Sequence, residues 1–115
     1  MLVGASTFNL LWTTTRFRAE NPKLYRAIMA ALDVATIFIK NDKQEAARLY
    51  LRVSKEPSSV EEVLALLSDI YIQFTLAPKN TFSYSKFMFK IGAIRNQPED
   101  WRDLFFSDPR LAVGS

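Results

Sequence analysis

Residues 21–41 read NPKLYRAIMAALDVATIFIKN, the longest uninterrupted helical pattern in the chain. Asn21 can cap a helix, and Pro22 suits the first helical position, where the N–H that proline lacks would be unpaired anyway. Apolar residues recur every three or four positions, which is the spacing of one helix face. They are Leu24, Ile28, Ala31, Ala35 and Phe38. We therefore predict a helix from Asn21 to Asn41.

Little polar surface remains on this predicted helix. At about 100° per residue, Arg26, Asp33 and Lys40 fall on one narrow stripe. Most of the remaining circumference is apolar and carries Tyr25, Met29, Ala30, Leu32, Val34, Ile37 and Ile39. A surface helix of a small domain is usually half apolar and half polar, so this one should have neighbours on several sides. If Ala30, Val34 or Ile37 proves exposed, part of those surroundings is absent.

Upstream of this helix, the chain is rich in β-branched and aromatic residues. Thr7 to Trp12 reads TFNLLW, which predicts a strand. A lone strand cannot form a sheet, so it would need a partner that the chain barely offers. Thr13 to Glu20 then predicts a short helix that leads into the long one.

Downstream, helix start signals recur at regular intervals. Asp42 and Glu45 form a capping-box pair that opens a helix through about Val53. Proline disfavours a helical conformation in the residue before it, so the sequence SKEP ends this helix. Ser59 and Glu62 repeat the capping-box pattern and predict a third helix.

The remaining sequence predicts one further helix between less regular segments. Residues 70–77, IYIQFTLA, alternate apolar and polar positions, which fits a short strand or an extended connection. Asn80 can cap a fourth helix for which Gly92 is a plausible stop. Pro98 starts a last short turn. Residues 107–115 are expected to form a surface loop.

The composition limits the possible functions. The chain has 115 residues, which corresponds to one domain or part of one. Its 15 Lys and Arg against 12 Asp and Glu give a net charge of only +3. The basic residues are spread along the chain, so the clustered charge typical of a nucleic-acid-binding protein is missing. We expect no nucleic-acid partner.

No catalytic or metal-binding constellation can be assembled from these residues. The chain contains no Cys and no His, which excludes thiol nucleophiles, Cys/His zinc sites and Ser-His-Asp triads. The pairs Glu61-Glu62 and Glu99-Asp100 are expected to be solvated first-turn residues of helices. The sequence has no phosphate-binding glycine pattern. We expect no enzyme activity, no catalytic residue, no metal and no cofactor.

The sequence also contains no targeting or spanning signal. MLVGASTFNLLW lacks a basic segment and carries polar residues, so it does not resemble a secretory signal. No apolar run reaches about 18 residues, so no membrane insertion is expected.

The order of the segments resembles a known family. The ordered set is TFNLLW, TTRFRAENP, KLYRAIMAALDVATIFIKNDK, AARLYLRVSKE, SVEEVLALLSD, FTLAPKNTFSYSKFMFKIGAI and WRDLFF. Together, over about residues 5 to 115, these segments resemble the C-terminal region of bacterial ABC-transporter substrate-binding proteins of the nitrate/sulfonate/taurine type. Members of that family are considerably longer, with two α/β lobes that close on a ligand.

The resemblance implies a mainly α chain, the C-terminal helical part of a two-lobe periplasmic-binding-protein fold, with a short N-terminal strand and about five helices. It would be a single partial domain, in which residues 1–20 form a crossover strand and short helix. Residues 21–105 would form the helical part of a lobe, and residues 106–115 a tail.

The resemblance also implies a function. The chain would belong to the solute-binding component of an ABC importer, with a small anionic or heterocyclic solute such as nitrate, a sulfonate, taurine or a pyrimidine-type compound. Its other partner would be the permease, and its location periplasmic or extracytoplasmic. Clefts lie at lobe boundaries, so the crossover residues Thr7, Asn9 and Trp12 are the candidate ligand-binding residues.

A second interpretation remains open. The apolar surface of the long helix could instead contact a protein partner, because exposed apolar patches mark interfaces as well as missing pieces. The chain would then be a stand-alone helical protein–protein interaction module.

Overall fold

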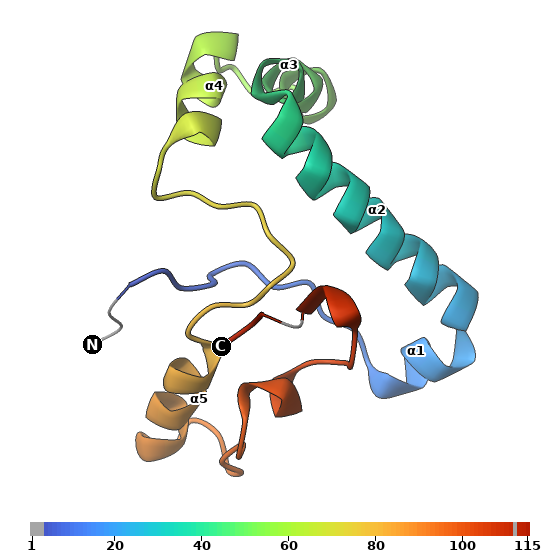
Figure 1. Cartoon of the computed structure of the whole chain (residues 1–115), viewed down its shortest axis with the longest axis vertical. Helices are drawn as coiled ribbons and strands as arrows, with labels where there is room; N and C mark the ends of the chain where they lie inside the picture. The colour runs from blue at the N-terminus through green and yellow to red at the C-terminus, as the bar shows by residue number, and fades with distance from the viewer. Residues whose placement is uncertain (1–3, 112) are drawn as a thin grey trace. The chain divides into compact units, whose positions relative to one another are not determined.

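The computed structural model describes residues 4–111 and 113–115, and it is mainly helical, as predicted (Figure 1). Across this described part, five α-helices and two short 3-10 helices are present, and no strand. They are α1 (Thr15–Glu20), α2 (Pro22–Asn41), α3 (Lys43–Ser54), α4 (Val60–Ser68), α5 (Thr81–Lys90), η1 (Trp101–Leu104) and η2 (Pro109–Leu111). Residues 1–3, the first residues of MLVGASTFNLLW, and Ala112 of the predicted tail lie outside the described residues.

The helices fall into two compact units. Thr13–Thr75 form the first, which we call the helical unit, and it contains α1 to α4. The segments that flank it in the sequence, up to Trp12 and from Leu76 onward, form the second, which we call the flanking unit. It contains α5, η1 and η2.

The helix starts of the helical unit follow from local side-chain chemistry. The Asp42 carboxylate accepts a hydrogen bond from the Glu45 N–H at 2.9 Å and caps α3. Ser59 and Glu62 form the predicted reciprocal capping box of α4, with bonds of 2.8 and 3.1 Å. Each such cap satisfies helix N–H groups that have no partner inside the helix, and contributes about 1 kcal/mol. The predicted starts of both helices are confirmed.

Asn21 lies at the predicted boundary but does not cap α2 with its side chain. Its Nδ2 donates to the Phe17 carbonyl at 3.1 Å, and its N–H donates to the same oxygen at 2.9 Å. Asn21 is the only residue between α1 and α2, so it ends one helix and precedes the next. The expected cap is wrong because the amide serves the last turn of α1 instead.

The core of the helical unit is small. α3 packs against α4 and also contacts α2, and the buried apolar residues are Ala46, Ala47 and Val63. α2 contributes no buried residue at all. Val34 is 67% exposed, Ile37 is 51% exposed, and Ala30 is also exposed. The apolar side of α2 is therefore only partly covered by this chain.

Two predicted extended segments are irregular in the structure. Thr7 to Trp12 is not a strand, so that prediction is wrong. Thr7 N–H donates to the Lys79 carbonyl at 3.0 Å, but the Lys79 N–H donates to the Thr7 hydroxyl at 2.9 Å rather than to a backbone carbonyl. The Thr7 side chain thereby occupies the Lys79 N–H, which in a β-ladder would donate to a backbone carbonyl of the opposite strand. Residues 70–77 form a connection and no strand, with a turn at Ile70 and Tyr71 and a bend at Leu76 and Ala77.

The flanking unit is built around α5. This helix ends at Lys90, and Gly92 adopts a positive φ of 75°, so the predicted glycine stop is confirmed. The buried residues of the flanking unit include Ala77, Thr81, Ser85 and Trp101. The predicted surface loop 107–115 differs from expectation, because it contains η2 and its last residues contact the start of α5.

Candidate functional site

The three candidate ligand-binding residues lie on the irregular segment of the flanking unit. Thr7 is half-buried and held to Lys79 through both its N–H and its hydroxyl oxygen. Asn9 is exposed, and Trp12 is 82% exposed. Within the part of the chain that the structure describes, the side chains of Asn9 and Trp12 make no hydrogen bond or ring contact. Asn9 therefore offers an amide, and Trp12 a flat apolar face, to a molecule outside this chain.

Thr7 belongs to a polar junction of three segments, residues 5–7, 78–81 and 113–115. On one side, Asn80 Nδ2 donates to the Ala5 carbonyl at 2.7 Å. On the other, Ser115 N–H donates to the Pro78 carbonyl at 2.9 Å, and Asn80 N–H donates to Ser115 Oγ at 3.1 Å. The junction thus joins residues that are far apart in the sequence.

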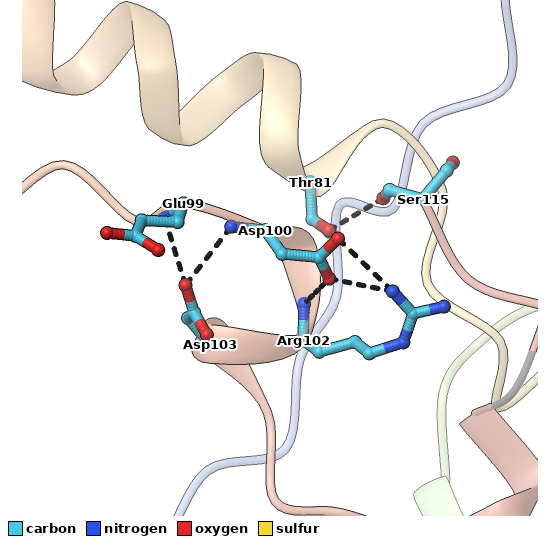
Figure 2. Close-up of polar contacts among 6 residues, drawn as sticks. All are labelled: Thr81, Glu99, Asp100, Arg102, Asp103 and Ser115. Atoms are coloured by element: carbon cyan, nitrogen blue, oxygen red, sulfur yellow. Dashed lines mark hydrogen bonds and ion pairs between the residues drawn. The ribbon is translucent and has the colours of Figure 1, made fainter.

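The junction also replaces a predicted helix cap. Asn80 precedes α5, as expected, but its φ of 54° is left-handed and its side chain makes no capping bond. Instead, the N–H and the hydroxyl of Thr81 both donate to the backbone oxygen of Ser115, at 2.9 and 2.8 Å. Figure 2 shows the bond from the hydroxyl. The predicted Asn80 cap is wrong, because the Asn80 backbone is left-handed and its amide donates to the distant Ala5 carbonyl. Nothing in the local sequence around α5 signals this partner.

Gly114 is a further requirement of the junction. A Cβ at this position would lie 2.7 Å from the Trp101 ring and 2.8 Å from the Pro78 ring. Trp101 and Pro78 are both buried, so neither can move aside freely. Absence of a side chain therefore allows residues 113–115 to lie against the core of the flanking unit.

We expect Gly114→Ala to destabilise the flanking unit by about 1–3 kcal/mol, the usual cost of overpacking. Urea unfolding followed by Trp fluorescence measures this loss, because Trp101 is buried in that unit. Val113→Ala is the matched control, since the neighbouring Val113 side chain is exposed and its truncation should change stability by less than about 0.5 kcal/mol. Equal stability of Gly114→Ala and the unmodified chain would contradict the tight contact.

The acidic pair Glu99-Asp100 precedes η1, and the structure gives its Asp100 a capping role. The Asp100 carboxylate accepts bonds from the Arg102 N–H at 2.9 Å and from Arg102 Nη1 at 3.0 Å. The Asp103 carboxylate accepts from the N–H groups of Glu99 and Asp100, at 2.9 and 3.1 Å, as Figure 2 shows. These carboxylates therefore organise the turn that carries Trp101.

The backbone hydrogen bond from Arg102, together with the hydrogen bond and charge of its side chain, lowers the pKa of Asp100. Hydrogen bonding to Glu56 raises the pKa of the Tyr50 hydroxyl in the helical unit. Neither shift produces a group that titrates near neutral pH, where a general acid or base works best. These two groups therefore offer structural interactions rather than proton transfer.

The lowered pKa of Asp100 predicts a pH dependence. The group stabilises the folded form above the ordinary aspartate pKa of about 3.9, and this contribution is lost as the pH falls through the lower folded value. In an NMR titration, the Asp100 carboxyl carbon should therefore titrate below about 3.9. Asp100→Asn should remove this contribution to the acid sensitivity of η1. A midpoint at or above the ordinary value would contradict the capping role.

The described residues hold no cluster of three or more acidic side chains that could bind a metal ion. In the same residues, no helix is both long enough and apolar enough to cross a membrane. No family model, curated protein or solved structure matches the chain. Its function must therefore be argued from the geometry above and from the order of its sequence segments.

Proposed function

We propose that this chain is the C-terminal helical part of the solute-binding component of an ABC importer, for a small anionic or heterocyclic solute. The observation that carries the proposal is the surface of α2. None of its residues is buried, and its apolar side leaves Val34 and Ile37 more than half exposed. Burial of such a side stabilises a helix by about 25 cal/mol per Å² of apolar area removed from water. A sheet of the same lobe would provide that cover.

The order of the sequence segments supplies the second support. The solute-binding family it resembles places a crossover segment before a long helix, and here Thr7 to Trp12 precedes α1 and α2. In this proposal the two lobes close on the solute by a hinge motion that ligand contacts with both lobes favour. The closed form then docks on the permease.

The candidate residues suit such a cleft by their chemistry. The Thr7 oxygen accepts from the Lys79 N–H, so its own O–H can be donated to an anion. The Asn9 amide is a second donor, and the exposed Trp12 ring can stack on a planar heterocycle. The three residues would line one wall of the cleft, and the other lobe would supply the rest.

Because one wall binds weakly, the purified 115-residue chain should show no micromolar affinity for nitrate, taurine, an alkanesulfonate or a pyrimidine. Isothermal titration calorimetry tests this directly, and micromolar binding of any of these compounds would contradict the proposal. The genomic sequence immediately upstream provides a second test. We expect it to encode the rest of a two-lobe protein in the same reading frame, either intact or degraded.

A two-lobe protein that contains this chain allows a sharper test. Asn9→Ala and Trp12→Ala should each weaken solute binding about tenfold, the loss expected from about 1.4 kcal/mol of contact energy. Phe8→Ala is the matched control, because Phe8 lies in the same segment, is exposed, and has no proposed role. Unchanged affinity in both Asn9→Ala and Trp12→Ala would refute the assignment of these residues.

The exposed apolar side of α2 also favours a second candidate, a stand-alone helical protein–protein interaction module. Light scattering and thermal unfolding of the chain separate the two. A stable monomer or defined dimer with a cooperative transition favours the module. An aggregation-prone species that unfolds with poor cooperativity favours the solute-binding component, because its helices would lack the sheet that covers them.

A further inference from the structure

The helical unit contains a hollow of about 390 Å³ that none of the sequence patterns predicted. It lies where the end of α2, the start of α3, the end of α4 and the connection after α4 come together. Small-molecule sites have volumes of about 300–1,000 Å³, so this hollow suits a small ligand. All of its lining residues belong to Thr13–Thr75.

Half of the residues that line the hollow are apolar, and the other half are Lys40, Lys43, Gln73 and Thr75. Ile39 and Leu67 are half-buried, whereas Ile72 and Phe74 on the connection are partly exposed. A flat apolar molecule placed among these side chains would remove their exposed surface from water, which is favourable. The Phe74 ring adds a face on which an aromatic molecule can stack. The apolar half of the lining therefore suits the planar apolar body of a ligand.

The charge of the hollow has one sign. Lys40 and Lys43 are the ionisable residues that line it, and no carboxylate does. In the described residues neither lysine makes an ion pair or a side-chain hydrogen bond. Asp42 lies between them in the sequence, but its carboxylate caps α3 by accepting the Glu45 N–H at 2.9 Å. The two ammonium groups are therefore available to an external anion.

We infer that this hollow binds a small aromatic carboxylate, with the carboxylate at Lys40 and Lys43 and the ring against Phe74. The two lysines are opposite in charge to a carboxylate, and their ammonium groups can donate one hydrogen bond to each of its two oxygens. This site is separate from Thr7, Asn9 and Trp12, which lie outside the helical unit. The inference goes beyond the proposed function and does not depend on it.

The probe for this site is 2-naphthoate, with the neutral 2-naphthamide as its matched control. For a ligand of this size, at about 0.3 kcal/mol per heavy atom, the dissociation constant should be on the order of 1 mM. Titration of the full chain followed by ¹H–¹⁵N NMR should show saturable shifts at Ile39 to Lys43 and Ile72 to Thr75. Shifts confined to Thr7 to Trp12, or no saturable shifts, would overturn the inference.

Charge removal tests the role of the lysines. The double substitution Lys40→Gln and Lys43→Gln should weaken naphthoate binding about tenfold and leave naphthamide binding unchanged. Lys23→Gln is the control, because it removes one positive charge from the other end of α2, away from the hollow. Circular dichroism should give the same helix content for all variants. Equal affinity for naphthoate and naphthamide, or equal naphthoate binding by the double variant and Lys23→Gln, would refute the carboxylate site.

Discussion

Trp101→Ala is expected to destabilise the flanking unit by about 3–5 kcal/mol, the usual cost of truncating a large buried side chain. Trp101 is only 9% exposed and is the largest of the buried apolar residues. Its ring lies beside Gly114 at the junction, and its centroid is 6.0 Å from that of Phe105. The Arg102 guanidinium stands 4.8 Å from the same ring. Loss of the indole would therefore leave a cavity shared by several segments.

The measurement is urea unfolding of the chain, followed by circular dichroism and by hydrogen exchange resolved for each unit. Trp12→Ala provides the matched control, because it removes the same side chain from a position that is 82% exposed. That control should change the free energy of unfolding by less than about 0.5 kcal/mol. Exchange should accelerate in α5 and η1 of Trp101→Ala. Similar losses for the two tryptophan variants would show that Trp101 is not the centre of this core.

The second large effect is expected at Ala47 in the helical unit. Ala47 is 0% exposed on α3, the helix that packs against α4. Ala47→Glu would place a longer, charged side chain at a position with no exposed surface. Desolvation of that carboxylate and overpacking of the α3–α4 contact should together cost about 3–5 kcal/mol, so α3 and α4 should separate or unfold.

Ala65→Glu is the control for this change, since Ala65 is exposed on α4 and the substitution is the same. It should leave the thermal unfolding midpoint of the helical unit nearly unchanged. Circular dichroism detects the difference, because most of the helical residues belong to α2, α3 and α4. If Ala47→Glu were as stable as Ala65→Glu, the α3–α4 contact could not be the core of this unit.

The sequence was informative about the helices and less informative about the candidate site. The caps at Asp42 and Ser59 act within three residues, so their pattern is visible in the sequence and confirmed in the structure. The Gly92 stop is equally local, because it depends on the positive φ of one residue. The exposed side of α2 also follows from its spacing, since one chain offered too few neighbours to cover it.

The candidate site could be predicted only in part. Thr7, Asn9 and Trp12 were chosen from a family resemblance, and their role as ligand-binding residues stays a prediction. Residue types alone could not show that Thr7 bonds to Lys79, which is 72 positions away. Nor could they indicate the hollow beside Lys40 and Lys43, which exists only where three helices and a connection converge.

The sequence by itself determined the mainly α class and the positions of the helices, because capping and helical periodicity depend on residues within about one turn of each other. Tertiary structure decided the conformation of the segments between them. Thr7 to Trp12 did not become a strand because the Thr7 hydroxyl takes the Lys79 amide, and Asn80 does not cap α5 because its side-chain amide donates to the Ala5 carbonyl. Such bonds join distant residues, and only the folded chain brings them together.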